Sequence, residues 1–256
     1  MLIAVTRPVS PSLARCELTH VSREPIDVDR AAAQHAAYER QLTALGATLV
    51  RVAAAPDLPD AVFVEDTAVV LAELAVITRP GAASRRGESA AVAALLVAYR
   101  PVHVMSAPAT LDGGDVLRLG RTLYVGRSGR TNEHGIEQLR DFVAPFGYRV
   151  VPVGFTGCLH LKSAASAIGD ERVLLNPAWV AAAAFAGCET LAVDAREPYA
   201  GNALAIAGSV LHPSQYPRTR ERIEACGVRV APVDCDELAK AEGAVTCCSL
   251  VFEGAD

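Results

Sequence analysis

The chain has 256 residues, of which 51% are hydrophobic and 21% charged, and its formal net charge is −5. This composition is typical of a globular protein with a substantial core, and it argues against a disordered chain. Basic residues are dispersed and no apolar run approaches the roughly 20 residues that cross a bilayer, so we predict neither a nucleic-acid-binding patch nor a membrane span.

The first predicted elements are a short strand, a long loop and a helix. Residues 2–6 form an apolar strand without the features of a signal peptide, so the cytoplasm is the expected location. Residues 8–26 mix Pro, Ser, Arg and Glu without periodicity, which predicts a loop, and a loop of this length often carries function. Helical spacing of apolar residues predicts a helix over 29–45, followed by a strand at 47–52.

From there a unit recurs, in which a hairpin begins with polar residues and is followed by a helix. Two copies are clear, and they comprise hairpins at 65–78 and 113–126 and helices at 85–99 and 132–142. Weaker copies start near Lys162 and Gly201, and a last one starts at Cys247 and stops, as though residues 1–6 completed it. We call the polar start of each unit its polar head. Five polar heads at a spacing of roughly 40 to 50 residues indicate a repeat architecture.

These repeats predict the fold class. Pairing the half-length first and last units closes a ring and removes exposed sheet edges. We therefore predict one α/β domain over residues 1–256, a five-bladed propeller with pseudo-fivefold repeats around a central channel. The alternative is a plain α/β sandwich whose similar segments are coincidental. A ring would bring the five polar heads to one central cavity, and they are Glu65 with Asp66, residues 112–115, His160, Asn202 and Cys247.

The seven cysteines are an odd set without a C-x-x-C pair, which predicts reduced thiols. Cys247 opens an apolar run, and we interpret it either as a nucleophile, which must react as the thiolate, or as a small buried core residue. Neighbouring residues of a strand face opposite sides, so Cys248 should not share its site. The other five are expected to be packing residues or inert surface thiols, and they are Cys16, Cys158, Cys188, Cys226 and Cys235.

Histidine and carboxylates supply the remaining candidates. His160 lies between two leucines, where a histidine is either a catalytic base or a hydrogen-bonded core residue. The acidic residues are either solvated or converge on a cavity that selects a guanidinium or ammonium group, because close carboxylates repel one another without a cation. Their spacing does not match a calcium loop and zinc lacks further soft ligands, so we expect no metal and no other cofactor. These residues are Asp60, Glu65, Asp66, Asp112 and Asp115.

Two arginines occupy corresponding places in their repeats. Arg85 follows the first hairpin and Arg130 the second. Either could be an ordinary surface arginine. Beside an acidic cavity, however, the pair could hold the carboxylate of an amino acid whose side chain points at the acids, and that amino acid would be an arginine derivative.

The motifs together resemble one family over nearly the whole chain. In order, they are Phe63-Val64-Glu65-Asp66, Ile77-Thr78-Arg79-Pro80-Gly81 with Ser84-Arg85-Arg86, Leu111-Asp112-Gly113-Gly114-Asp115-Val116-Leu117, Arg130-Thr131-Asn132, Leu159-His160-Leu161-Lys162-Ser163 and Thr246-Cys247-Cys248-Ser249. The combination resembles the dimethylarginine dimethylaminohydrolases, whose fold is the five-bladed α/β propeller called pentein. The resemblance implies hydrolysis of Nω,Nω-dimethyl-L-arginine, or the monomethyl form, to L-citrulline and a methylamine.

The resemblance also implies a role for each matching residue. Cys247 would be the nucleophile, since in the family the cysteine directly after the threonine reacts, and His160 with Asp112 beside it would be the general acid and base. The substrate-binding set would be Glu65 and Asp66 for the guanidinium, Arg85 and Arg130 for the α-carboxylate, and Asp60 with the backbone carbonyls of Leu18 and Ala241 for the α-amino group. Leu18 lies in the early loop, which would close over substrate as a lid.

The implied mechanism proceeds through a covalent alkylthiouronium on Cys247. Acidic surroundings predict that Cys247 is mostly a thiol in the free enzyme and that the bound cation lowers its pKa. The lid matches the family only loosely, so the preference between dimethyl and monomethyl substrates stays open. Whether the protein forms a homodimer also stays open. Two further functions stay open as well, namely an arginine or agmatine deiminase that releases ammonia and a propeller that binds arginine derivatives without turnover. The family also implies a place in arginine metabolism and nitric oxide regulation.

Overall fold

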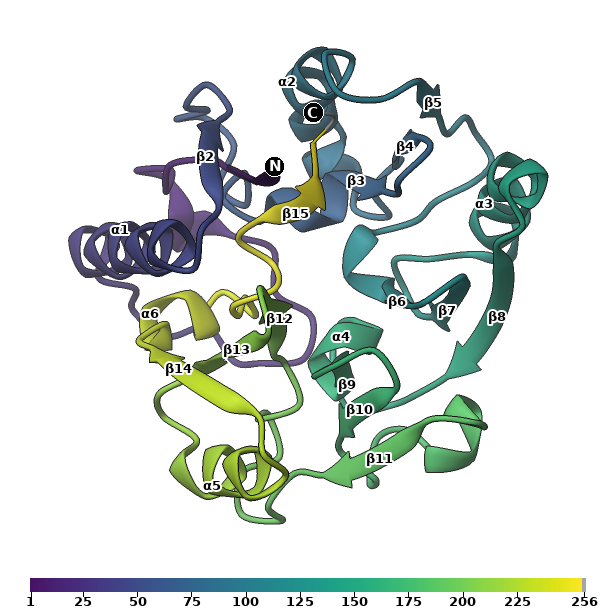
Figure 1. Ribbon diagram of the computed structural model, residues 1–256. Helices are drawn as coiled ribbons and strands as arrows, with labels where there is room; N and C mark the ends of the chain where they lie inside the picture. The colour runs from purple at the N-terminus through teal and green to yellow at the C-terminus, as the bar shows by residue number, and fades with distance from the viewer. Residues whose placement is uncertain (255–256) are drawn as a thin grey trace.

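The computed structural model describes residues 1–254, and its strands form five three-stranded sheets arranged as the blades of a ring (Figure 1). This confirms the predicted five-bladed α/β propeller and excludes the plain sandwich. Over the same residues no helix has the length and apolar character needed to span a membrane.

Every blade has the same strand order. An inner strand pairs antiparallel with a middle strand, which pairs parallel with an outer strand. The inner strands are β3 (Ala68–Val70), β6 (Val116–Leu119), β9 (Ala165–Ala167), β12 (Leu204–Ile206) and β15 (Leu250–Glu253). The middle strands are β4 (Ala75–Ile77), β7 (Thr122–Arg127), β10 (Arg172–Leu175), β13 (Ser209–Pro213) and β1 (Leu2–Thr6). The outer strands are β5 (Val102–Val104), β8 (Arg149–Gly154), β11 (Glu189–Ala192), β14 (Arg229–Val233) and β2 (Thr48–Arg51).

The two ends of the chain share one blade. In it β1 pairs antiparallel with β15, from Leu2 opposite Glu253 to Val5 opposite Leu250, and parallel with β2. The N-terminal and C-terminal segments therefore complete one another, as the half-length first and last repeats predicted. Because β15, from the C-terminus, pairs with β1, from the N-terminus, the two ends of the chain make one complete blade and the ring is closed (Figure 1).

Helices on the outside of the ring connect the middle strand of a blade to its outer strand (Figure 1). Asp27 and Asn132 cap the first and third of them, accepting the backbone N–H of Arg30 and Gly135. In the fourth blade the connection contains only a short 3-10 helix. The connecting helices are α1 (Val28–Ala44), α2 (Ser89–Leu96) after η3 (Ala83–Glu88), α3 (Glu133–Val143) with η5 (Ala144–Phe146), η6 (Ala182–Phe185) and α5 (Pro217–Ala225).

The polar heads are short helices and turns instead of the strand starts that the sequence predicted. Three of them are η2 (Val64–Thr67), η4 (Gly113–Asp115) and α4 (Leu161–Ala164), while residues 245–248 form a turn before β15. The remaining short helices are η1 (Leu13–Arg15), within the early loop, and α6 (Asp236–Ala239). Helical turns expose backbone donors to neighbouring heads, and the Glu65 N–H donates to the Cys247 carbonyl at 3.1 Å. The heads therefore bond to one another across blades.

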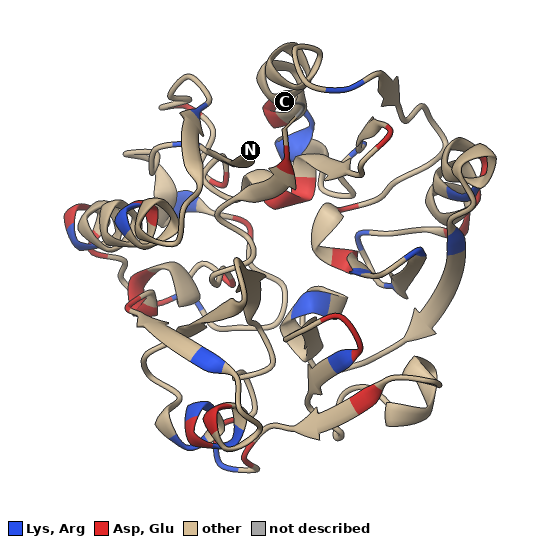
Figure 2. Cartoon of the chain, in the orientation of Figure 1, with Lys and Arg blue, Asp and Glu red and all other residues tan. Residues whose placement is uncertain are grey.

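Five hydrophobic clusters fill the molecule around the ring, and the inner strands enclose a channel of about 780 Å³. Glu65, Lys162 and Thr246 line its end nearest the polar heads. Figure 2 shows charged segments of η2 and α4 facing the middle of the ring, beside inner strands that are mostly tan. The predicted central channel is therefore present, and charged residues close the end that adjoins the polar heads.

Candidate active site

A small cavity lies beside the polar heads, and none of its lining residues lines the channel. Its walls include Cys247, His160, Asp66 and the two arginines Arg85 and Arg130. Asp60 and Ala241, both predicted site residues, also line it. The cavity has a volume of only about 10 Å³, which is room for one water molecule. Most of the predicted site therefore comes together in one place, in a closed arrangement.

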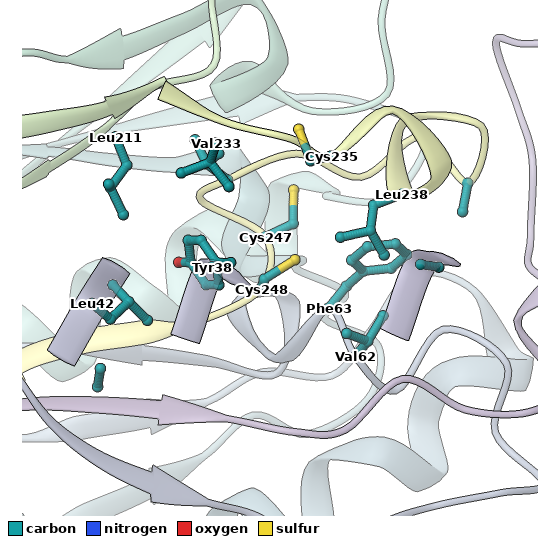
Figure 3. Close-up of a cluster of buried hydrophobic side chains, with 14 of the residues drawn as sticks. Tyr38, Leu42, Val62, Phe63, Leu211, Val233, Cys235, Leu238, Cys247 and Cys248 are labelled. Atoms are coloured by element: carbon teal, nitrogen blue, oxygen red, sulfur yellow. The ribbon is translucent and has the colours of Figure 1, made fainter. Parts of the chain in front are cut away.

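Cys247 lies in the turn before β15, not in the strand that the sequence predicted. Its carbonyl is fixed by the Glu65 N–H, and its thiol faces the cavity. The Cys248 thiol points in a different direction (Figure 3) and donates to the Ala244 carbonyl at 3.5 Å within a hydrophobic cluster. Only one of the two adjacent cysteines therefore faces the site. All seven cysteines of the chain are free.

Burial, with Glu65 and Asp66 nearby, raises the pKa of the Cys247 thiol to about 12. A thiol in this setting is neutral at physiological pH, which agrees with the resting state expected from the sequence. A cation bound against the same carboxylates would favour the thiolate, because it would offset their charge.

His160 precedes α4 and lies between two carboxylates. Its Nε2 is 3.0 Å from Asp112 Oδ2, and its Nδ1 is 3.7 Å from Asp66 Oδ1. Burial disfavours the imidazolium, but Asp66, Asp112 and Asp115 outweigh it and raise the pKa of His160 to about 9. The imidazole is therefore protonated at neutral pH and can act first as an acid.

Asp112 and Asp66 are themselves held by the backbone. Asp112 Oδ1 accepts the N–H of Gly81 at 2.9 Å, and Asp66 Oδ1 accepts the N–H of Gly114 at 2.9 Å. Burial favours the neutral form of Asp66, but His160, Arg85 and this N–H outweigh it and lower the pKa of Asp66 to about 2. A fixed negative charge therefore lies against the cavity, where a guanidinium could bind.

Arg85 is almost fully engaged by protein partners. Its Nη1 lies 2.7 Å from Asp66 Oδ2, while Nε and Nη2 bond to the two oxygens of Glu88 at 3.1 and 2.9 Å. Nη2 also approaches the carbonyls of Asp60 and Phe63. Burial would lower the pKa of Arg85, but Asp66 and Glu88 raise it well above its usual value. Glu88 therefore fixes this guanidinium, a role that sequence reasoning missed.

The guanidinium of Arg130, unlike that of Arg85, is only partly engaged by protein partners. Its Nη2 donates to Thr19 Oγ1 of the early loop at 3.2 Å. Its buried Nη1 lies 3.9 Å from Asp112 Oδ2 and has no hydrogen-bond partner among the described residues, 1–254. A buried unpaired donor is costly unless a ligand completes it. Arg130 is thus placed to receive an anionic group in the cavity.

The early loop covers the cavity. Glu17 lines it and donates its N–H to Asp60 Oδ2 at 3.2 Å, while Leu18 is half-buried and packs against the neighbouring hydrophobic cluster. Burial raises the pKa of Asp60, although Arg85 opposes this. Ala241 lies opposite, after α6. The loop predicted as a lid is therefore closed over the predicted α-amino group site.

Glu65 lies behind the cavity, with its side chain turned toward the central channel. Its oxygens bond to Lys162 Nζ at 2.6 Å and Thr246 Oγ1 at 2.8 Å. Thr246 in turn bonds to Asn202 through both its hydroxyl and its N–H. Glu65 and Asn202 therefore join a buried network that supports the turn carrying Cys247, and they do not line the cavity.

Gly114 and Asp115, from the polar head at 112–115, also shape the site. A side chain at Gly114 would place its Cβ 2.6 Å from His160 Nδ1, so only glycine fits there. Asp115 accepts the Leu161 N–H and the hydroxyl of Thr131, which ties α4 to the third blade. The Gly-Gly-Asp motif at 113–115 carried this signal, whereas nothing in the sequence pattern distinguished Glu88 or Glu242.

Asp66, Asp112 and His160 could hold a metal ion, since one ligand atom of each lies within 4.8 Å of the others. The raised pKa of His160 opposes this, because an imidazolium has no free lone pair for a metal. The donor set favours a proton in this position at neutral pH.

Comparisons with known proteins show which family the chain resembles. A family model described as "N,N dimethylarginine dimethylhydrolase, eukaryotic" matches residues 19–181. The chain is 40% identical over 258 residues to an N(G),N(G)-dimethylarginine dimethylaminohydrolase of Streptomyces coelicolor, covering 96% of this chain and 95% of that protein. It is 34% identical over 228 residues to the enzyme of that name from Pseudomonas aeruginosa, covering 88% of this chain and 90% of the relative.

Solved structures give the same result. A Pseudomonas aeruginosa enzyme of this kind, a cysteine-to-serine variant complexed with citrulline, superposes with a TM-score of 0.93 at 33% identity, covering 97% of this chain and 98% of the other. The N-terminal domain of an arginine dihydrolase, ArgZ from cyanobacteria, superposes with a TM-score of 0.84 at 18% identity, covering 98% of each chain. This second similarity shows the fold alone.

Proposed function

The chain belongs to the dimethylarginine dimethylaminohydrolase family, and we propose that it hydrolyses Nω,Nω-dimethyl-L-arginine, and the monomethyl form, to L-citrulline and the corresponding methylamine. The observation that carries the proposal is that one cavity contains the Cys247 thiol, the protonated His160 and the ionised Asp66. A nucleophile, an acid and an anion for a cationic carbon are the groups that this reaction requires.

Substrate recognition follows from the charges around the cavity. Asp66 would hold the guanidinium, and the unpaired Nη1 of Arg130 would bind the α-carboxylate beside Arg85. Asp60 would bind the α-amino group together with the carbonyls of Leu18 and Ala241. Glu65 would act from behind, through its hydrogen bond to Thr246, as a support for the turn that carries Cys247.

The first half of the reaction forms a covalent intermediate. The substrate cation favours loss of the Cys247 proton to solvent, and the thiolate adds to the guanidinium carbon to give a tetrahedral adduct. Protonated His160 donates its proton to the substituted nitrogen, and the C–N bond breaks to release the methylamine. The product on the enzyme is an alkylthiouronium, and His160 is left neutral.

The second half returns the enzyme to its starting state. Neutral His160 accepts a proton from water as the water oxygen attacks the thiouronium carbon. The C–S bond then breaks, the hydroxyl proton of the adduct moves to the departing sulfur, and citrulline leaves. Asp112, which accepts a hydrogen bond from His160 Nε2, would stabilise the imidazolium in both halves.

The lid must open during this cycle, because a cavity of about 10 Å³ cannot admit an amino acid. Opening of the loop that contains Leu18 would admit substrate, and closing it would separate the charged groups from bulk solvent while leaving room for the attacking water molecule. We propose that the chain forms one catalytic domain and acts in the cytoplasm. That it forms a homodimer is a separate hypothesis, which light scattering would test.

A panel of substrates tests the proposal. We expect citrulline and a methylamine from both methylated arginines, and little turnover of arginine or agmatine. Arginine turnover with ammonia release would instead indicate a deiminase, which shares the cysteine and histidine chemistry. Tight binding of methylated arginine without citrulline would indicate a binding protein.

A further inference from the structure

We infer that Glu242 is a positioning residue for the substrate α-ammonium group, because it fixes both backbone carbonyls that would receive this group. The inference rests on the proposed function. Glu242 follows α6, is half-buried, and lines the cavity beside Ala241. No sequence motif singled it out, and it takes no part in the chemistry at Cys247.

The Glu242 carboxylate binds the lid through two consecutive backbone amides. Oε2 accepts the N–H of Thr19 at 2.7 Å, and Oε1 accepts the N–H of His20 at 2.7 Å. On the other side of Leu18, the N–H of Glu17 donates to Asp60. The lid backbone is thus held by a carboxylate on each side of Leu18.

The Thr19 N–H and the Leu18 carbonyl belong to one peptide group. A trans peptide is planar, with its N–H and C=O pointing in opposite directions, and the one cis bond among residues 1–254 is elsewhere, at Ala107-Pro108. Fixing the N–H on Glu242 therefore fixes the direction of the carbonyl. Within the described chain neither Leu18 nor Ala241 has a hydrogen-bond donor on its carbonyl oxygen, so both oxygens are free for a ligand.

Glu242 also determines the second carbonyl through its own backbone. Its φ of 59° lies in the left-handed region, which is uncommon for a residue other than glycine. The turn is closed by its N–H bonding to the Ala239 carbonyl and by the Gly243 N–H bonding to the Leu238 carbonyl. This turn orients the peptide that carries the Ala241 carbonyl. A strained backbone at such a site is expected where function requires the side chain.

Charge adds to the geometric effect. A carboxylate that accepts an N–H polarises the peptide and increases the negative charge on its carbonyl oxygen, which then attracts an ammonium more strongly. Thr19 also accepts a hydrogen bond from Arg130, the residue proposed to bind the α-carboxylate. Closing of the lid would therefore complete both ends of the amino acid site together.

Kinetics with two substrates test this role. In Glu242→Gln and Glu242→Gly, we expect KM for dimethylarginine to rise by about tenfold or more and kcat to stay within about twofold, because the ammonium contact is the same in ground and transition states. For Nω,Nω-dimethyl-5-guanidinopentanoate, which lacks the α-amino group, kcat/KM should fall much less than for dimethylarginine, because the loosened lid affects it but the lost ammonium contact does not. Glycine suits the left-handed backbone, so Glu242→Gly should fold. Glu221→Gln, an exposed carboxylate on α5, is the matched control.

Amide hydrogen exchange of the free protein gives a second measurement, in which Thr19 and His20 should exchange faster in both variants. Equal loss of activity on the two substrates would show a structural role and overturn the inference, as would unchanged KM in an active enzyme. If the wild-type protein hydrolyses neither substrate, the proposed function fails and the positioning role fails with it. These outcomes separate the two claims.

Discussion

His160 Nε2 lies 3.0 Å from Asp112 Oδ2, with both side chains almost fully buried. The two residues are 48 positions apart in the sequence, and their hydrogen bond joins the polar heads of two different blades. Asp112 cannot turn away, because its other oxygen accepts the Gly81 N–H. Together with Asp66, whose charge has the larger effect, this contact keeps the imidazole charged in a place where burial alone would make it neutral.

Replacing Asp112 by asparagine should lower the pKa of His160 from its value of about 9. A neutral amide removes one of the charges that favour the imidazolium, and an opposite charge at this range typically shifts a pKa by 1–3 units. We expect kcat at pH 7 to fall by up to about tenfold, since a pKa lowered to between about 8 and 6 leaves less of the acid form at neutral pH. Nitrogen NMR titration of the imidazole checks the pKa directly, and an unchanged value would contradict this account.

Cys247 should react slowly with iodoacetamide in the free protein at neutral pH. Because its pKa is raised to about 12, the thiolate fraction and the alkylation rate should keep rising throughout the accessible alkaline range. The experiment is repeated with a saturating concentration of an unreactive cation that resembles a guanidinium and leaves the Cys247 sulfur exposed. This cation should shift the dependence of the alkylation rate on pH to lower pH. A rate that already reaches its plateau near pH 7 without ligand would show a resting thiolate. Cys248→Ser serves as the control for labelling at the adjacent thiol.

Arg130→Gln should raise KM for dimethylarginine by about 30-fold or more and leave kcat less affected. Removing one partner of a buried charge pair typically costs about 2–5 kcal/mol. Among residues 1–254, Nη1 of Arg130 has an ion pair with Asp112 at 3.9 Å but no hydrogen bond, so the proposed carboxylate would be its hydrogen-bond partner. Nω,Nω-dimethylagmatine lacks the carboxylate, so the same variant should not weaken its turnover further. The exposed Arg127 pairs with Glu133 at the surface, and Arg127→Gln should match the wild type. Equal losses on both substrates would argue against carboxylate binding.

Gly114→Ala should lower kcat/KM by about 100-fold or more. The added methyl would lie 2.6 Å from His160 Nδ1 and 2.7 Å from Asp66 Oδ1, so one of these groups must move, and small displacements of catalytic groups have effects of this size. Gly154→Ala is the matched control, since its Cβ would meet nothing within 4 Å. Activity in Gly114→Ala close to that of this control would mean that the imidazole position is not critical.

The sequence allowed the ring to be predicted because its signals are local and repeated. Each hairpin has its own turn and each outer helix its own periodicity, and the two half-length units at residues 1–6 and 247–253 can pair only if the ring closes. The fourth blade was weak in the sequence because only the short helix η6 connects its strands β10 and β11. The polar heads were misread as strand starts, since four-residue helical turns leave no periodicity to detect.

The identities of the site residues were predictable, but the directions of their side chains were not. Glu65 and Asp66 are adjacent, yet one faces the channel and the other the cavity, because η2 turns them apart. Arg85 and Arg130 occupy equivalent places in the repeats, but Glu88 binds the guanidinium of Arg85, whereas Nη1 of Arg130 has no hydrogen-bond partner among residues 1–254. Such differences depend on the directions of side chains in short helical turns and on individual contacts, which a spacing pattern cannot contain.

The most direct test of the account is citrulline formation from asymmetric dimethylarginine by the wild type, Cys247→Ser and Cys248→Ser. We predict turnover by the wild type and by Cys248→Ser, whose thiol lies outside the cavity, and none by Cys247→Ser. Activity that persists in Cys247→Ser, or that disappears in a folded Cys248→Ser instead, would contradict the assignment of the nucleophile and the mechanism built on it.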